Sequence, residues 1–141
     1  MEHTASVRVL VVEDHPMVRR GICSLLSQDP SLDVICEAAD GEEAVIRAEE
    51  LQPDLILMDV RLPGITGIEA TRRIRRISRK SQIIFVSQND SEQMARAAFS
   101  TGGQGYVVKS DVGRELLKAI SAVRQGQEFV SQRLIDQGWV N

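Results

Sequence analysis

The chain has 141 residues, 43% of them hydrophobic and 26% charged, which is ordinary for one globular domain with a core of its own. The net charge of −3 argues against a nucleic-acid-binding domain as the main content. No apolar stretch approaches the roughly 18 residues of a membrane span, and no secretory leader opens the chain. We therefore expect a cytoplasmic protein without membrane contact. In such a protein, Cys23 and Cys36 are expected to be reduced core thiols rather than a functional pair.

Two strand–helix units are predicted in the first third of the chain. The apolar run Val7–Val12 has the composition of a buried parallel strand. A proline suits the first turn of a helix, so we expect the first helix to begin near Pro16. Residues 33–38 are predicted to form the second strand. The second helix should begin after Asp40, which has the spacing of a capping box with Glu43.

Two more units follow in the middle of the chain. Residues 55–59 form a short, almost wholly apolar strand, and the helix after it is predicted over Gly67–Ile77. Residues 83–87 are predicted to form the next apolar strand. The helix that follows has Asp90 or Ser91 as its cap and only a small apolar face, which predicts the weakest helix of the fold.

The last unit is predicted from residue 106 onward. Residues 106–108 form a strand, and the final helix spans Val112–Arg124 and ends at Gly126. We therefore expect one doubly wound α/β domain with a five-stranded parallel sheet over residues 7–126, after an N-terminal tail of residues 1–6. Residues 127–141 could form one more short helix on the domain, with Trp139 packed against it, or begin a connection to a domain that the chain lacks.

Charged side chains follow three of the predicted strands. Glu13 and Asp14 come after the first strand, Asp59 ends the third, and Lys109 follows the fifth. Each alone could be a turn, cap or solvated residue. Because ligands bind outside the carboxyl ends of parallel strands, we expect the four to meet at one edge of the sheet. Three carboxylates and an ammonium group there indicate a Mg²⁺ and phosphoryl site.

Four segments resemble the signature segments of response-regulator receiver domains. They are residues 11–16, 57–64, 85–87 and 105–109, in the order and spacing of that family. Residues 14–21 are most similar to the NarL/FixJ (LuxR-type) subfamily. The resemblance covers about residues 7 to 126 and implies a flavodoxin-like (CheY-like) fold with the strand order 2-1-3-4-5.

The resemblance also implies roles for individual residues in phosphoryl transfer. Asp59 resembles the phosphoacceptor. Glu13 and Asp14 resemble the acidic pair that holds Mg²⁺, together with Asp59 and the backbone carbonyl of Arg61. Lys109 resembles the lysine that pairs with the phosphoryl group. A divalent cation suits this chemistry because it offsets the repulsion between a carboxylate and a phosphoryl dianion.

The remaining implied roles concern switching and access. Ser87 resembles the hydroxyl that hydrogen-bonds the phosphoryl group, and Tyr106 the aromatic switch residue that turns inward, remodelling the face of the fourth helix, fifth strand and fifth helix. The alternative for Tyr106 is a half-buried aromatic on an edge strand. Arg61 and Asn89 occupy positions that influence phosphoryl lifetime in the family. Gln88 stands where a small residue is usual, so it is expected to narrow access to the acceptor.

The implied partners are those of a two-component pathway. The phosphoryl donor would be a phosphohistidine on a sensor histidine kinase, and phosphorylation-driven homodimerisation is a further hypothesis. Receivers of this subfamily usually precede a helix-turn-helix domain of roughly 60 residues. We therefore expect transcriptional control through an output domain missing from this chain, with DNA contacted only by that domain. The alternative is a stand-alone receiver that signals through protein contacts.

Two other classes compete with a receiver. One is an enzyme with an aspartyl nucleophile, but such hydrolases commonly carry a second Asp two residues on, where this chain has Arg61. We expect no enzyme activity beyond self-phosphorylation chemistry on Asp59. The other class is a flavodoxin-like cofactor binder. The acidic end of the first strand argues against it, since a phosphate-bearing cofactor favours backbone N–H groups of a glycine-rich loop there.

Overall fold

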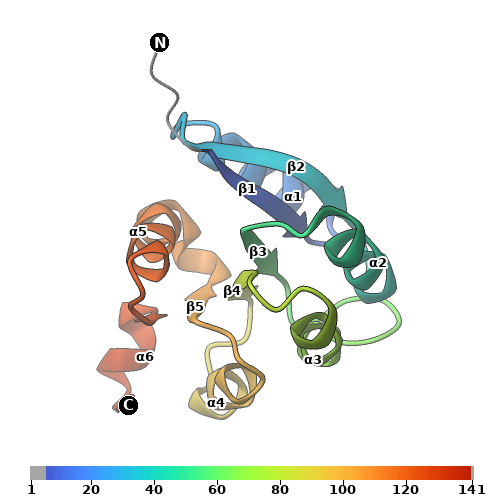
Figure 1. Cartoon of the computed structure of the whole chain (residues 1–141). Helices are drawn as coiled ribbons and strands as arrows, with labels where there is room; N and C mark the ends of the chain where they lie inside the picture. The colour runs from blue at the N-terminus through green and yellow to red at the C-terminus, as the bar shows by residue number, and fades with distance from the viewer. Residues whose placement is uncertain (1–5, 141) are drawn as a thin grey trace.

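Six parallel strands form one sheet at the centre of the computed structural model, which describes residues 6–140 (Figure 1). Their spatial order is β2-β1-β3-β4-β5-β6. The predicted order is correct for the first five strands, but the predicted count of five is one short. The strands are β1 (Val7–Val12), β2 (Leu32–Ala38), β3 (Leu55–Met58), β4 (Gln82–Ser87), β5 (Gly105–Val108) and β6 (Phe129–Val130).

Helices cover both faces of the sheet. Figure 1 shows α1 and α5 on one face and α2, α3 and α4 on the other. A short 3₁₀ turn, η1 (Lys109–Asp111), joins β5 to α5. The helices are α1 (Pro16–Leu26), α2 (Gly41–Leu51), α3 (Gly67–Ile77), α4 (Glu92–Ser100), α5 (Val112–Arg124) and α6 (Gln132–Asp136).

The alternation of strand side chains explains why both faces are covered. In β1, Val9 and Val11 pack toward α1 and α5, while Leu10 and Val12 pack toward the other three helices, and none is more than 2% exposed. Successive strand residues point to opposite faces, so an unbroken apolar run requires a helical layer on each side. Cys23 and Cys36 are partly buried free thiols that pack against opposite layers.

Capping side chains fix where the helices begin. Asp40 Oδ1 accepts a hydrogen bond from the Glu43 amide at 2.8 Å, as the capping-box spacing predicts. The Glu43 carboxylate reaches back to the amide of Ala39, at 2.9 Å. Ser91, rather than Asp90, caps α4 by accepting from the Met94 amide at 3.1 Å.

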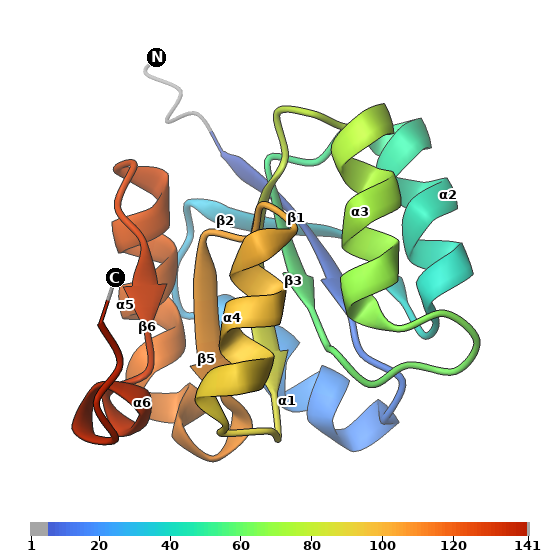
Figure 2. The ribbon, with the colours of Figure 1, turned by 90° about the horizontal axis from the view of Figure 1, so that it is seen from below.

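The C-terminal segment packs onto the domain. Strand β6 pairs with β5, and β6 and α6 lie beside β5 and α5 (Figure 2). Leu134 of α6 is 1% exposed within the core, and the Trp139 ring contacts Phe99 of α4 at 5.5 Å between centroids, with the Arg96 guanidinium 4.4 Å from its centre. The predicted packing of Trp139 on the domain is therefore confirmed.

The limits of the described chain bear on two expectations. Residues 1–5 of the predicted N-terminal tail, and Asn141, lie outside the described residues. Within residues 6–140, no helix has both the length and the apolar character that crossing a membrane requires.

Candidate phosphoryl and metal site

Side chains from three strands meet at the carboxyl edge of the sheet. The parallel register sets the last residues of β1 and β3 level with each other. The polar residues after them therefore leave the sheet side by side. Lys109, directly after β5, places its Nζ 2.7 Å from Glu13 Oε1 and 2.9 Å from Asp59 Oδ2. The structure thus brings together the residues that the sequence predicts to meet.

Backbone contacts around the turn after β3 hold Asp59 in place. The Asp59 amide donates to the Val12 carbonyl at 3.1 Å, which continues the pairing of β3 with β1. The Gly67 amide donates to the Val60 carbonyl at 2.8 Å and brings the first residue of α3 against Asp59. A Cβ at Gly67 would overlap the Asp59 carbonyl oxygen, so only glycine permits this approach.

The three acids differ in their surroundings. Glu13 is 1% exposed and Asp59 4% exposed, whereas Asp14 is open to solvent. Glu13 also accepts a hydrogen bond from the His15 amide at 3.0 Å, so both of its oxygens are engaged. His15 caps α1 by accepting a hydrogen bond from the Val18 amide at 3.4 Å.

The donor set fits Mg²⁺. Each of Glu13, Asp14 and Asp59 can offer one carboxylate oxygen, and these oxygens lie within 4.8 Å of one another. Mg²⁺ prefers hard oxygen ligands and keeps several waters, so a partly open cluster of acids suits it. The Arg61 amide lies 3.3 Å from Asp59 Oδ1, and Arg61 also lines the cavity. The ligand role of its carbonyl stays a prediction.

Burial and neighbouring charges shift the pKa values of Asp59 and Lys109. Burial, with a smaller contribution from the Glu13 charge, raises the pKa of Asp59 from 3.8 to about 6 against the opposing effect of Lys109. Burial acts to lower the pKa of the Lys109 ammonium, but its hydrogen bonds with Glu13 and Asp59 outweigh this and leave that pKa above its usual value. A carboxyl group in a cavity whose pKa is strongly shifted by burial and by a specific charged partner is a candidate functional group.

The loop after β4 forms the opposite wall of a cavity of about 400 Å³. Ser87 is 2% exposed, and its Oγ accepts from the Asn89 amide at 3.0 Å. Gln88 is exposed and lines both this cavity and a neighbouring groove of about 720 Å³ between α1 and α5. The expectation that Gln88 narrows access to Asp59 stays a prediction. The cavity is lined by Glu13, Asp14, His15, Val18, Asp59, Val60, Arg61, Ser87, Gln88, Asn89, Met94 and Lys109.

Tyr106 is fully buried, beyond the half-burial that the edge-strand alternative predicts. Its residue is 0% exposed, and its hydroxyl donates to the Asn89 carbonyl at 2.7 Å. Because β6 pairs with β5, Tyr106 does not lie on an edge strand. The alternative of a half-buried edge aromatic is therefore wrong. The ring already points inward, linked directly to the loop that carries Ser87.

Comparison with known proteins assigns the family. The profile of the response regulator receiver domain matches residues 9–121. The chain belongs to this family. It is a receiver domain of a two-component response regulator with the CheY-like α/β fold, and its predicted NarL/FixJ type is confirmed by its relatives. Receiver domains bind Mg²⁺ at an acidic pocket, which corresponds here to the cluster of Glu13, Asp14 and Asp59.

Two curated relatives and one solved structure illustrate the similarity. Response regulator GacA of Pseudomonas viridiflava is 37% identical over 131 residues, covering 93% of this chain and 61% of GacA. Nitrate/nitrite response regulator protein NarL of Escherichia coli (strain K12) is 34% identical over 134 residues, covering 95% of this chain and 62% of NarL. This chain thus spans about three fifths of the length of these relatives. The crystal structure of a LuxR-family two-component response regulator from Aurantimonas sp. SI85-9A1 has a TM-score of 0.87 and 38% identity, covering 94% of this chain and 97% of that chain.

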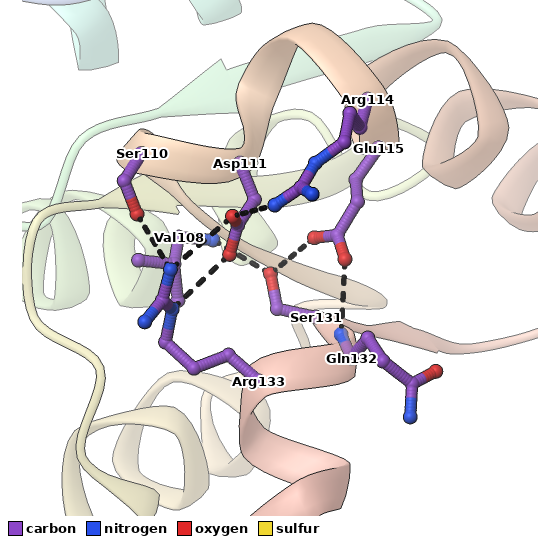
Figure 3. A network of polar contacts seen from close by, with 8 residues as sticks. All are labelled: Val108, Ser110, Asp111, Arg114, Glu115, Ser131, Gln132 and Arg133. Atoms are coloured by element: carbon purple, nitrogen blue, oxygen red, sulfur yellow. Dashed lines mark hydrogen bonds and ion pairs between the residues drawn. The ribbon is translucent and has the colours of Figure 1, made fainter.

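A polar network beyond the acidic site was missed by the sequence reading. It joins residues 108–115 to residues 131–133 (Figure 3). The tail carries no motif that indicates these contacts, since they depend on the fold to bring segments about 20 residues apart against each other.

Proposed function

We propose that Asp59 accepts a phosphoryl group from a sensor histidine kinase, with Mg²⁺ held by Glu13, Asp14, Asp59 and the Arg61 carbonyl. The observation that carries this proposal is the Lys109 ammonium, 2.9 Å from the oxygen of a buried carboxylate beside an acidic cluster. A bound Mg²⁺ would neutralise charge between the attacking carboxylate and the phosphoryl oxygens.

The transfer is a displacement at phosphorus. An electron pair of an Asp59 carboxylate oxygen forms the new O–P bond, and the N–P bond of the phosphohistidine breaks with its electrons leaving on the imidazole nitrogen. The product is an acyl phosphate. Lys109, already paired with that carboxylate, is placed to follow the added negative charge. The Ser87 hydroxyl would donate to a phosphoryl oxygen.

The signal would then spread through the loop after β4. Ser87 bonded to the phosphoryl group would draw the loop inward, and Asn89, which accepts from the buried Tyr106 hydroxyl, would move with it. The result is a changed face of α4, β5 and α5. Because α4 is short and has a small apolar face, it suits an element with two positions. Arg61, Gln88 and Asn89 are the proposed modulators of phosphoryl lifetime and access.

The downstream role is drawn from the longer relatives. We propose that the receiver controls a transcriptional output domain, with DNA bound by that domain and homodimerisation promoted by phosphorylation. The chain covers 62% of NarL, a nitrate/nitrite response regulator protein, which leaves room for such a domain in proteins of that length. The alternative remains a stand-alone receiver acting through protein contacts. The length of the intact gene product separates the two.

Intact-mass spectrometry after incubation with acetyl phosphate and Mg²⁺ tests the chemistry. We expect one phosphoryl adduct on the wild type, and none with a chelator or in Asp59→Asn. The matched control is Asp33→Asn, which removes an exposed carboxylate of β2 and should leave the adduct intact. An equal adduct on Asp59→Asn would contradict the acceptor. Turnover of a small phosphate ester would instead favour the enzyme class.

A further inference from the structure

The residues on both sides of Lys109 are bonded to the C-terminal segment. On one side, the Val108 amide donates to Ser131 Oγ at 2.8 Å. On the other, the Arg133 guanidinium donates to Ser110 Oγ at 3.3 Å and to the Asp111 carboxylate at 3.2 Å (Figure 3). Lys109 therefore lies between two points of attachment to residues 131–133.

The Ser131 attachment is buried and fully hydrogen-bonded. Ser131 is fully buried, its amide donates to the Tyr106 carbonyl at 2.9 Å, and its hydroxyl donates to Glu115 Oε1 at 2.6 Å. The other oxygen of Glu115 accepts from the Gln132 amide at 3.0 Å. With every polar atom of the serine engaged, its oxygen defines the position of the Val108 amide.

The Arg133 attachment is charge-assisted. The Asp111 residue is 4% exposed and lies between Arg133 and Arg114, which is 2.6 Å away on α5. Hydrogen bonds from Arg133 and then Arg114 hold the pKa of Asp111 below its usual range, which shows that its ionised form is favoured. Such bonds are stronger and more directional than neutral ones.

Lys109 lies where β5 ends and a short turn begins. The residue begins η1, a three-residue turn between the end of β5 and the start of α5. A turn this short lacks the repeated hydrogen bonds that fix a residue within a long helix. The direction of the Lys109 side chain toward Asp59 therefore depends on where its neighbours are held.

We propose that Ser131 and Arg133 are positioning residues, which hold η1 so that the Lys109 ammonium reaches the group carried by Asp59. The effect of this positioning on phosphorylation rests on the function proposed above. Coupling between two sites is reciprocal, so a phosphoryl group that tightens Lys109 would also tighten the docking of residues 129–140. The far end of that segment is held on α4 by Trp139.

The first test compares two arginines that touch the same carboxylate. Arg133→Gln removes the attachment from the C-terminal segment, whereas Arg114→Gln removes a partner on α5 that is 79% exposed and leaves that attachment in place. Using acetyl phosphate and intact mass, we expect Arg133→Gln to slow phosphorylation about five-fold and Arg114→Gln to change the rate by less than about two-fold. A wild-type rate for Arg133→Gln, or an equal loss in both variants, would overturn the proposal.

The second test needs no phosphorylation. Urea midpoints are measured for the wild type, Arg133→Gln, Lys109→Met and the double variant. Residues that act through each other combine non-additively, so we expect the double variant to lose less than the two single losses together. Additive shifts would refute a positioning role. If the wild type gains no phosphoryl adduct with acetyl phosphate, the proposed function fails. The comparison of the four urea midpoints then decides by itself whether Arg133 acts through Lys109.

Discussion

Replacing Asp59 by asparagine should stabilise the fold. Asp59 is 4% exposed, and burial raises its pKa from 3.8 to about 6 despite the Lys109 ion pair. Each step of one in pKa corresponds to about 1.4 kcal/mol. Ionising Asp59 in the folded state therefore costs about 3 kcal/mol, a cost that an asparagine of the same shape does not incur. In Asp59→Asn, Lys109 still has Glu13 as a partner at 2.7 Å.

The sign of the effect sets its pH dependence. The pKa of Asp59 is higher in the folded state than in the unfolded state. The stability that protonation of Asp59 contributes to the fold is therefore fully present below pH 3.8 and is lost as the pH rises through about 6. Without divalent cations, the free energy of unfolding of Asp59→Asn should exceed that of the wild type by about 3 kcal/mol at pH 8. Near pH 3, below both pKa values, the two proteins should unfold alike.

Urea denaturation of the metal-free protein measures this difference. At a typical slope of about 2 kcal/mol per molar urea, the midpoint of Asp59→Asn should lie about 1–2 M above that of the wild type at pH 8. The control Asp33→Asn, at an exposed position of β2, should match the wild type at both pH values. A midpoint for Asp59→Asn at or below the wild type at pH 8 would refute the reasoning.

Three further predictions concern the surroundings of the site. Mg²⁺ should raise the urea midpoint of the wild type at pH 8, because it is expected to bind the acidic cluster of the folded protein. An unchanged midpoint in a large excess of Mg²⁺ would argue against the site. Gly67→Ala should lower the free energy of unfolding by about 1–3 kcal/mol through overlap with the Asp59 carbonyl. The control Gly21→Ala, in open space on α1, should raise the free energy of unfolding by about 0.5–1 kcal/mol. Equal urea midpoints for the two variants would contradict this. Gln88→Ala should speed phosphorylation by a kinase domain more than by acetyl phosphate, since Gln88 is exposed and lines the cavity that holds Asp59. The same acceleration with both donors would count against a steric role.

The sequence predicts the elements whose signals are local. Val7–Val12 is recognisable as a buried strand because only Arg8 interrupts its apolar run. Asp40 is recognisable as a helix start because its capping partner is three residues away. The meeting of Glu13, Asp59 and Lys109 is also predictable, since parallel strands bring their carboxyl ends to one edge.

What could not be predicted depends on contacts between distant segments. Strand β6 has only two residues, too few for an alternating pattern, and exists because β5 offers it a free edge. That pairing also removes Tyr106 from the sheet edge, where the alternative interpretation of the sequence places it half buried. The contact between Asp111 and Arg133 is equally unpredictable from the sequence, because the two residues lie 22 positions apart.

The measurement that tests the central claim most directly is the site of the phosphoryl group itself. After reaction with acetyl phosphate and Mg²⁺, borohydride reduction converts an aspartyl phosphate into homoserine, which peptide mass mapping locates by residue. The account predicts homoserine at position 59, dependent on Mg²⁺ and absent from the unreacted protein. Homoserine at another aspartate, or none at position 59 when intact mass shows the adduct, would contradict it.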